Sequence, residues 1–321
     1  MIRTKHAPLH VVAVTHPGTA GKQNEDRFAV SSYQVSETDS TQSIFAIVSD
    51  GIGGHLAGEV AAEMAVETIS HMVAQSDARQ PLETLDHSIQ VTSEAIASKA
   101  KDSTQRLGMG TTCACAWVIG NRLFTASVGD SRIYLLRNGG LMQLTIDHTW
   151  VQEAVEKGIL EPEDARRHPN VHVIRRYLGS PKTPQADIRL RLAADESDTQ
   201  SRSNQGLHLL PGDLILLCTD GLTDVVEDDE IEPALRGLAL QSAAQALVDL
   251  ACSRNGKDNI TVALILVPWG EELSGKKRSN FWQWALWGLV GLVLLALVIA
   301  GLAWVIVRIV LPPVPTPIII P

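Results

Sequence analysis

A series of short, β-prone apolar runs joined by tight turns limits the fold of this 321-residue chain more than any other feature. Turn signals such as 120–122, 138–140 and 211–213 separate neighbouring runs. Strands connected by hairpins form antiparallel sheets, because a parallel pair needs a longer crossover. The β-prone runs cover residues 9–14, 43–50, 111–119, 122–130, 132–139, 213–220 and 260–267.

Helical periodicity appears between these runs, over residues 57–74, 82–101, 148–157 and 242–253. Helices and strands do not alternate regularly, so the pattern predicts an α+β fold rather than a repeated βαβ unit. The polar or proline-containing segments 158–185 and 194–206 are interpreted as surface loops, the second of them mobile.

The stretch from Ala285 to Val307 contains no charged residue and is long enough for a helix to cross a bilayer. Tryptophans flank it, and the basic cluster 276–278 precedes it, which places the preceding residues in the cytoplasm. A buried core helix is the alternative, although soluble helices are rarely apolar on every face. The predicted organisation is a domain at 1–269, a juxtamembrane linker at 270–280, a transmembrane helix at 281–308 and a short extracytoplasmic tail at 309–321.

The net charge of −9 argues against nucleic acid as the main partner, because phosphate backbones attract basic surfaces. The four cysteines form no CxxC pair, so they are expected to be reduced and buried rather than to bind zinc.

Several aspartates stand at the ends of apolar runs, each beside a turn. Carboxylates gathered at one sheet edge repel one another unless a cation neutralises them. Oxygen donors without His or Cys favour Mg²⁺ or Mn²⁺ over zinc. Two such ions can bind a phosphoryl oxygen and activate a water molecule. The aspartates concerned are Asp26, Asp50, Asp130, Asp220 and Asp258.

Seven motifs together resemble bacterial metal-dependent Ser/Thr protein phosphatases of type 2C. They span residues 10–267 approximately, in the order of that family, and the first long one is VSDGIGGHLAGEVAA at 48–62. The resemblance implies a four-layer α-β-β-α sandwich of two antiparallel sheets flanked by helices. The other motifs are NED (24–26), MGTT (109–112), VGDSRIYLLRNG (128–139), LTIDHT (144–149), CTDGLTD (218–224) and DNIT (258–261).

The resemblance also implies roles for single residues. Asp50, Asp220 and Asp258 would bind one ion. Asp50 and the Gly51 carbonyl would bind a second, whose waters Glu25 and Asp26 hold. Asp130 would share a third, weaker ion with Asp220, and Asn259 would orient the site without touching an ion. Residues 158–180 match the family's flap, a segment that flanks the cleft and influences the choice of substrate.

The sequence departs from the family pattern at the phosphate-binding arginine, where Gly21 stands. The adjacent Lys22 is a candidate phosphate contact, and a solvated surface lysine is the alternative. Ile52 replaces a histidine found in some relatives, which leaves His55 as a candidate general acid or, alternatively, a structural or capping residue. His16 stands where the family commonly has Asp, and His168 in the flap is expected to pack.

The expected function is metal-dependent hydrolysis of phosphoserine and phosphothreonine on proteins at the cytoplasmic face of the inner membrane. Expected substrates are phosphorylated proteins, including membrane-associated Ser/Thr kinases and their targets. One alternative is a weak or inactive phosphoprotein-binding or sensing domain on the same fold, for which Gly21 is the motivation. Another is a metal-stabilised structural module.

Overall fold

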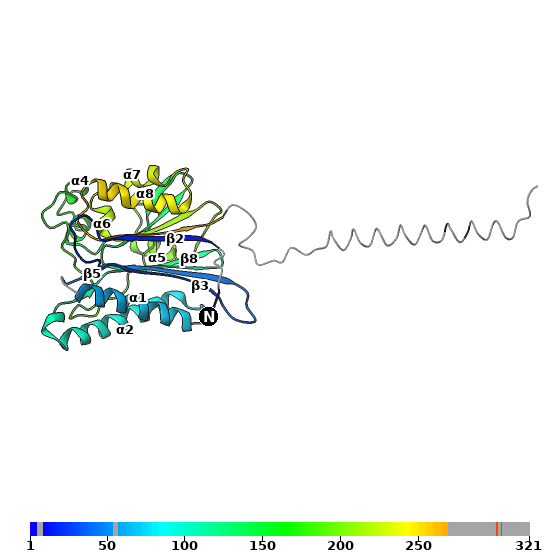
Figure 1. Cartoon of the computed structure of the whole chain (residues 1–321), viewed down its shortest axis with the longest axis horizontal. Coiled ribbons are helices and arrows are strands. Elements are labelled where there is room, and N and C mark those ends of the chain that lie inside the picture. The colour runs from blue at the N-terminus through cyan, green and yellow to red at the C-terminus, as the bar shows by residue number, and fades with distance from the viewer. Residues whose placement is uncertain (5–8, 54–56, 269–299, 301–302, 304–321) are drawn as a thin grey trace, which may run out of the picture. The chain divides into compact units, whose positions relative to one another are not determined.

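Two antiparallel sheets stack face to face, and each carries helices on its outer side (Figure 1). The computed structural model describes residues 1–4, 9–53, 57–268, 300 and 303. The layers follow the order helix, sheet, sheet, helix, which confirms the expected α+β sandwich.

The first sheet has the strand order β1-β3-β4-β7-β8-β11, and every neighbouring pair in it is antiparallel. Its central strand β4 is buried on both faces, which explains why its sequence is an almost continuous apolar run. The strands are β1 (Ile2–Arg3), β3 (Arg27–Gln34), β4 (Gln42–Ser49), β7 (Cys113–Ile119), β8 (Arg122–Val128) and β11 (Leu207–His208).

The second sheet has the order β10-β9-β12-β13-β2 and is also antiparallel throughout. A separate two-stranded ribbon joins β5 to β6 beside the first sheet. The strands are β2 (His10–His16), β9 (Arg132–Arg137), β10 (Gly140–Gln143), β12 (Leu214–Cys218), β13 (Ile260–Leu266), β5 (Gly51–Ile52) and β6 (Gly110–Thr111).

Two long helices, α1 and α2, cover the first sheet, whereas α7 and α8 cover the second (Figure 1). In α1 the buried residues Ala61, Ala65, Ile69 and Val73 recur every four positions and form one apolar stripe. The helices are α1 (Ala57–Gln75), α2 (Pro81–Lys101), α3 (Trp150–Glu156), α4 (Pro162–Ala165), α5 (Asp198–Ser203), α6 (Asp220–Thr223), α7 (Asp228–Leu235) and α8 (Leu240–Ser253), with a 3₁₀ turn η1 at Thr104–Arg106.

A layer of aliphatic side chains fills the space between the two sheets. Several of its members are alanines, which let the sheets approach closely. Cys113 and Cys115 face the opposite side, toward α1 and α2, as their alternate spacing predicts. The alanines between the sheets are Ala46, Ala114, Ala116 and Ala263.

The segment 194–206 differs from the expected mobile loop, because it contains the short helix α5. A capping box starts this helix, in which the side chains of Ser197 and Gln200 bond each other's backbone N–H groups. Asn204 then donates to the Leu190 carbonyl at 2.9 Å. These bonds order a segment whose composition is that of a loop.

The chain divides into two compact units, Met1–Gly275 and Lys276–Pro321. None of the helices in the described residues combines the length and apolarity that crossing a bilayer requires. Of the segment 281–308, where the transmembrane helix is expected, only Ala300 and Ala303 are described. The boundaries of the linker, helix and tail therefore stay predictions.

Candidate metal centre

The expected aspartates converge on one edge of the sandwich, because the antiparallel register brings their strand ends together. Asp26 directly precedes β3 and Asp50 directly follows β4, where Arg27 pairs with Ser49. Asp220 follows β12 and Asp258 precedes β13, where Cys218 pairs with Val262. The first two residues belong to one sheet and the last two to the other.

Glycines allow the loops at this edge to approach more closely than side chains would permit. A Cβ on Gly51 would overlap the backbone of Gly58 at the start of α1, and one on Gly58 would overlap the Glu25 carboxylate. A Cβ on Gly221 would overlap the Asn259 carbonyl. Since Gly51, Glu25, Gly221 and Asn259 each adjoin one of the aspartates in sequence, these three contacts help to set the spacing of the centre.

Asp26 links the two sheets at this edge. Its side chain is 2 % exposed. Oδ2 of Asp26 accepts hydrogen bonds from Oγ1 of Thr219 at 2.8 Å and from Oγ1 of Thr261 at 2.7 Å. Both threonines belong to the second sheet and its loops, whereas Asp26 leads into the first. The carboxylate is therefore held in one orientation from two sides.

Asp50 and Glu25 are fixed mainly through backbone contacts. The Asp50 N–H donates to Thr112 Oγ1 at 3.0 Å, and its carbonyl accepts from Thr111 Oγ1 at 2.6 Å. Asn259 accepts the Glu25 N–H on Oδ1 at 2.7 Å and donates through Nδ2 to the Pro17 carbonyl at 3.1 Å. Asn259 thus joins three loops, and its orienting role stays a prediction.

Three carboxylate oxygens at this edge are buried without a hydrogen-bond partner within the described part of the chain: Oδ1 of Asp26, Asp130 and Asp220. Burial and neighbouring negative charges raise the pKa of Asp26 to about 7, and burial raises the pKa of Asp220. The same causes, burial first, hold the pKa values of Asp50 and Asp130 well above their usual range. When these buried carboxylates are ionised, a cation would offset their charge.

Asp50, Asp220 and Asp258 line a large cavity of about 1080 Å³. Asp50, Gly51, Asp258 and Glu25 lie on its wall, and the exposed Lys22 stands at its rim. His55, the candidate general acid, lies outside the described residues. His16 accepts the Gly18 N–H on Nδ1 at 3.1 Å. His168, which is expected to pack, stacks on Trp150 with ring centroids 4.7 Å apart.

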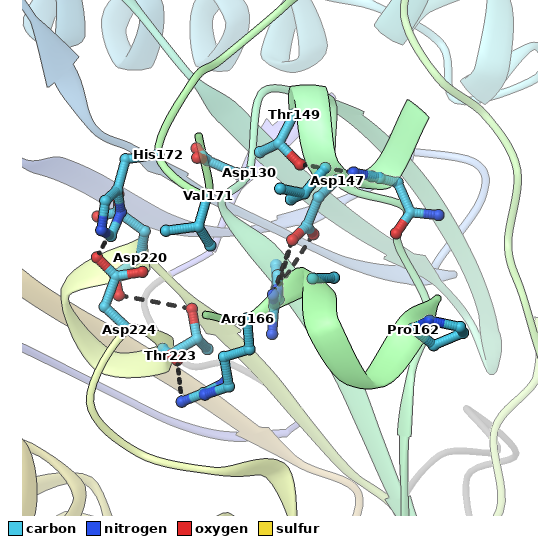
Figure 2. Close-up of a pocket in the computed structure, with 14 residues that line it drawn as sticks. Asp130, Asp147, Thr149, Pro162, Arg166, Val171, His172, Asp220, Thr223 and Asp224 are labelled. Atoms are coloured by element: carbon cyan, nitrogen blue, oxygen red, sulfur yellow. Dashed lines mark hydrogen bonds and ion pairs between the residues drawn. The ribbon is translucent and has the colours of Figure 1, made fainter. Parts of the chain in front are cut away.

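The resemblance assigned no role to Asp224, the last residue of the CTDGLTD motif, or to His172, although both line the large cavity. In Figure 2 the His172 ring points toward the Asp224 carboxylate, and Asp220 lies beside them. His172 Nδ1 lies 3.2 Å from Asp224 Oδ2. Burial and the charge of Asp220 raise the pKa of Asp224 to about 7. The four-residue spacing of Asp220 and Asp224 could have identified Asp224, because it places both side chains on one face of a helical turn.

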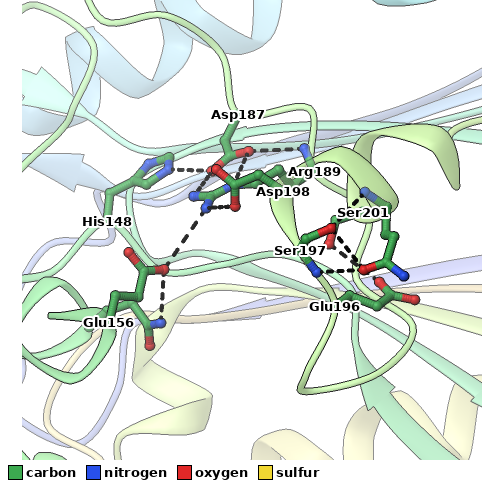
Figure 3. Close-up of polar contacts among 10 residues, drawn as sticks. His148, Glu156, Asp187, Arg189, Glu196, Ser197, Asp198 and Ser201 are labelled. Carbon is green, nitrogen blue, oxygen red and sulfur yellow. Dashed lines mark hydrogen bonds and ion pairs between the residues drawn. The ribbon is translucent and has the colours of Figure 1, made fainter. Parts of the chain in front are cut away.

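Asp130 lies in the turn between β8 and β9, and it lines a second, smaller cavity of about 240 Å³ together with Asp220. We call this the side cavity. His148 supports the turn: its Nδ1 accepts the Gly129 N–H at 3.0 Å, and its Nε2 lies 3.1 Å from Asp187 Oδ2. Arg189 binds the same Asp187 carboxylate and extends the network toward Asp198 and Glu156 (Figure 3).

The donor set at this edge suits hard divalent cations. Its oxygens come from carboxylates and a backbone carbonyl, which are the donors that Mg²⁺ and Mn²⁺ accept. The carboxyl groups of Asp50 and Asp220 are close enough to hydrogen-bond each other when one carries a proton. Since a cation in that place would remove both the repulsion and the unpartnered oxygens, the residues fit a metal centre.

Comparison with known proteins agrees with this geometry. Residues 16–252 match the family described as protein phosphatase 2C. The serine/threonine phosphatase Stp of Listeria monocytogenes is 36% identical over 262 residues, which cover 80% of this chain and 95% of Stp. The serine/threonine protein phosphatase PstP of Mycobacterium tuberculosis is 36% identical over 218 residues, and this match spans 68% of the chain but only 39% of the length of PstP.

Among solved structures, the catalytic domain of PstP in complex with two manganese ions has a TM-score of 0.66 and 31% identity. The match covers 81% of this chain and 99% of that domain. Fold, motif order and sequence identity over most of the chain agree. The chain therefore belongs to the protein phosphatase 2C family of bacterial serine/threonine phosphatases.

Proposed function

We propose that this protein removes phosphate from phosphoserine and phosphothreonine residues of other proteins with the help of divalent cations. The observation that supports the proposal most is the edge where Asp26, Asp50, Asp220 and Asp258 from two sheets converge. Three buried oxygens of the wider cluster, which includes Asp130, have no hydrogen-bond partner among the described residues. Stp and PstP are described as serine/threonine phosphatases, which agrees with this activity.

The residues of the chain would have separate roles in binding the cations and orienting water. Asp50, Asp220 and Asp258 would hold one cation, and Asp50 with the Gly51 carbonyl would hold the second; Asp130 would share a third, weaker one with Asp220. Bound Mn²⁺ or Mg²⁺ would supply Lewis-acid activation of water and of the phosphoryl group. Glu25 and Asp26 would orient water, and Asn259 keeps their loop against the loop of Asp258.

Substrate phosphate would enter the large cavity, whose described lining includes two exposed lysines, Lys22 and Lys257. Lysine binds phosphate as a point charge and lacks the fork of the arginine that Gly21 replaces. A Cβ on Gly21 would meet no atom within 4 Å, so the space beside this residue is open.

Release of phosphate from a phosphothreonine peptide by the full-length chain in detergent tests the activity. We expect turnover with Mn²⁺ or Mg²⁺, none in EDTA, and loss of turnover in Asp220→Asn. Asp249→Asn, on the exposed face of α8, is the control that should keep activity. A wild-type chain that binds the phosphopeptide without releasing phosphate would instead support the phosphoprotein-binding alternative.

The proposal also includes location at the inner membrane, with the catalytic domain in the cytoplasm opposing Ser/Thr kinases. The uncharged stretch 285–307 and the preceding basic cluster 276–278 support it. Cell fractionation should place the chain in the membrane, and protease added to intact spheroplasts should leave the catalytic domain uncut. Recovery of the whole chain in the soluble fraction would contradict this part of the proposal.

A further inference from the structure

The large cavity has two exposed lysines in its lining, Lys22 and Lys257, which we call the lysine pair. Lys22 belongs to the loop between β2 and β3, and Lys257 belongs to the loop between α8 and β13. No other Lys or Arg is among the described lining residues, whereas carboxylic residues are numerous there. These carboxylic residues are Glu25, Asp50, Asp220, Asp224 and Asp258.

Contacts between the two loops place the lysine pair on the same side of the cavity. The Thr19 N–H donates to the Gly256 carbonyl at 2.9 Å, and Thr19 Oγ1 donates to the same carbonyl at 3.0 Å. A Cβ on Gly18 would overlap the Asp258 carbonyl, so the two backbones touch there. Thr19 lies three positions before one lysine, and Gly256 directly precedes the other. The loops that carry the pair are therefore held against each other.

The lysine pair has no partner of its own in the part of the chain that the structure describes, where neither side chain forms an ion pair or a hydrogen bond. By contrast, Arg27 in the first of these loops binds Glu59, and Arg254 at the end of α8 binds Glu230. The whole chain has a net charge of −9, so carboxylates are not scarce. The two ammonium groups are therefore available to an anion that enters the cavity.

The cavity has room for more than one phosphorylated side chain. Its volume of about 1080 Å³ exceeds the roughly 300–1,000 Å³ of pockets that enclose drug-sized ligands. Successive residues of an extended peptide rise by only about 3.3 Å, so the residues beside a phosphothreonine would enter as well. The cations proposed for the metal centre would offset the charge of the phosphoryl group, which leaves Lys257 free to bind a second anionic group.

We propose that Lys257 makes this protein prefer phosphopeptides that carry Glu or Asp beside the phosphorylated residue. The inference deepens the proposed function and rests on it. Lys22 stays the candidate contact of the phosphate, whereas Lys257 would bind the carboxylate of the neighbouring substrate residue. An ammonium group on a flexible stem suits this task, because it can approach a carboxylate from several directions.

Three phosphothreonine peptides test the preference. They are identical except that the residues on both sides of the phosphothreonine are Glu, Ala or Lys. The full-length chain in detergent is saturated with Mn²⁺, and phosphate release gives the ratio of kcat/KM for the Glu peptide to kcat/KM for the Ala peptide. Any common effect on the metal centre cancels in this ratio. We expect a ratio of about two to five for an exposed ion pair, and a smaller ratio at high salt.

Reversal of the charge at Lys257 is the decisive variant. Lys257→Glu should turn over the Lys peptide better than the Glu peptide, because like charges would now repel. Lys182→Glu is the matched control, since Lys182 is exposed but lines neither the large cavity nor the side cavity, and it should keep the wild-type ratio. A wild-type ratio of one would overturn the inference. An equal loss of kcat/KM for all three peptides in Lys257→Glu would also overturn it, because Lys257 would then contact the phosphate itself.

Peptides with a phosphonate in place of the phosphate ester separate this inference from the proposed function. They cannot be hydrolysed, so fluorescence anisotropy of labelled peptides reports binding alone. If the chain releases no phosphate but binds the Glu phosphonate peptide more tightly than the Ala one, and Lys257→Glu reverses the order, the phosphatase activity is refuted and the charge preference stands. If it hydrolyses all three phosphopeptides equally well, the activity stands and the preference is refuted.

Discussion

His148 and Gly129 are joined by two hydrogen bonds that run in opposite directions. The Gly129 N–H donates to His148 Nδ1 at 3.0 Å, and the His148 N–H donates to the Gly129 carbonyl at 2.9 Å. Because Nδ1 accepts, the imidazole proton is on Nε2, which faces Asp187. Asp130 follows Gly129 directly, so this pair fixes the turn that carries a proposed metal ligand.

Two substitutions distinguish the contact at Nδ1 of His148 from the contact at Nε2. Asparagine can offer an oxygen near the place of Nδ1, whereas glutamine can offer an N–H near the place of Nε2. We expect His148→Gln to weaken cation binding at Asp130 by about 10–100-fold, as loss of a supporting contact does. His148→Asn should affect cation binding less. Isothermal titration with Mn²⁺ measures the difference, and equal effects of the two variants would show that His148 acts only by filling space.

Asp26→Asn should stabilise the metal-free protein and weaken its metal centre. Without cations, an ionised Asp26 is buried beside other carboxylates, and the amide removes that charge. At pH 8 in EDTA we expect a higher Tm than for the wild type. With saturating Mn²⁺ the order should reverse, because metal affinity falls by about 10–100-fold. A lower Tm in both conditions would mean that the bonds from Thr219 and Thr261 outweigh the charge.

Stability of the metal-free protein should fall as the pH rises from about 4 to about 8. The pKa values of Asp26 and Asp224 are raised to about 7 by burial and by nearby carboxylates, so the folded state binds protons that the unfolded state releases. Their stabilising contribution is complete below about pH 4 and is lost as the pH passes about 7. Hydrogen bonds from His148 and Arg189 lower the pKa of Asp187 although the residue is buried. The stability that Asp187 contributes is therefore lost only as the pH falls below about 4. Thermal unfolding in EDTA measures the trend, and Mn²⁺ should flatten it.

Gly221→Ala should destabilise the fold by about 1–3 kcal/mol, because the added methyl group would overlap the Asn259 carbonyl. The displaced Asn259 would also move the loop of Asp258, so Mn²⁺ affinity should fall. Gly140→Ala is the matched control, since its Cβ would meet nothing closer than 3.6 Å. Urea unfolding should show a change of less than about 0.5 kcal/mol for the control.

Lys22→Ala should raise the KM for a phosphothreonine peptide by about tenfold if the lysine contacts the phosphate, since charged hydrogen bonds contribute about 1.5–3 kcal/mol. kcat should change less, because Lys22 stands at the cavity rim rather than among the carboxylates. Lys22→Arg should retain most of the affinity. An unchanged KM in Lys22→Ala would assign Lys22 to the solvated surface.

The sequence predicts most of the metal edge, because Asp50, Asp130 and Asp220 end apolar runs, Asp258 precedes another, and antiparallel pairing brings such ends together. Asp26 and Asp50 meet because Arg27 pairs with Ser49. The neighbourhood of His172 could not be predicted in this way. It lies in an irregular segment, 48 positions before Asp220, and no periodicity reports how such a segment folds back.

Two elements that the sequence pattern does not predict, α5 and β3, form for different reasons. The segment 194–206 has a loop-like composition, yet the Ser197–Gln200 capping box starts a helix inside it. The sequence pattern does not predict strand β3, because its half-buried RFAVSSYQ sequence mixes polar with apolar positions. Pairing with β4 along its whole length stabilises it, and that partner cannot be read from the strand itself.

The alanine layer between the sheets has a consequence for the distant edge. Asp26 and Asp50 move with one sheet, and Asp220 and Asp258 move with the other, so the thickness of the interior controls how far apart the opposing carboxylates stand. A bulkier residue at Ala116 or Ala263 would push the two sheets apart. Substitutions at core residues that contact no ion are therefore expected to change the affinity of the proposed metal centre.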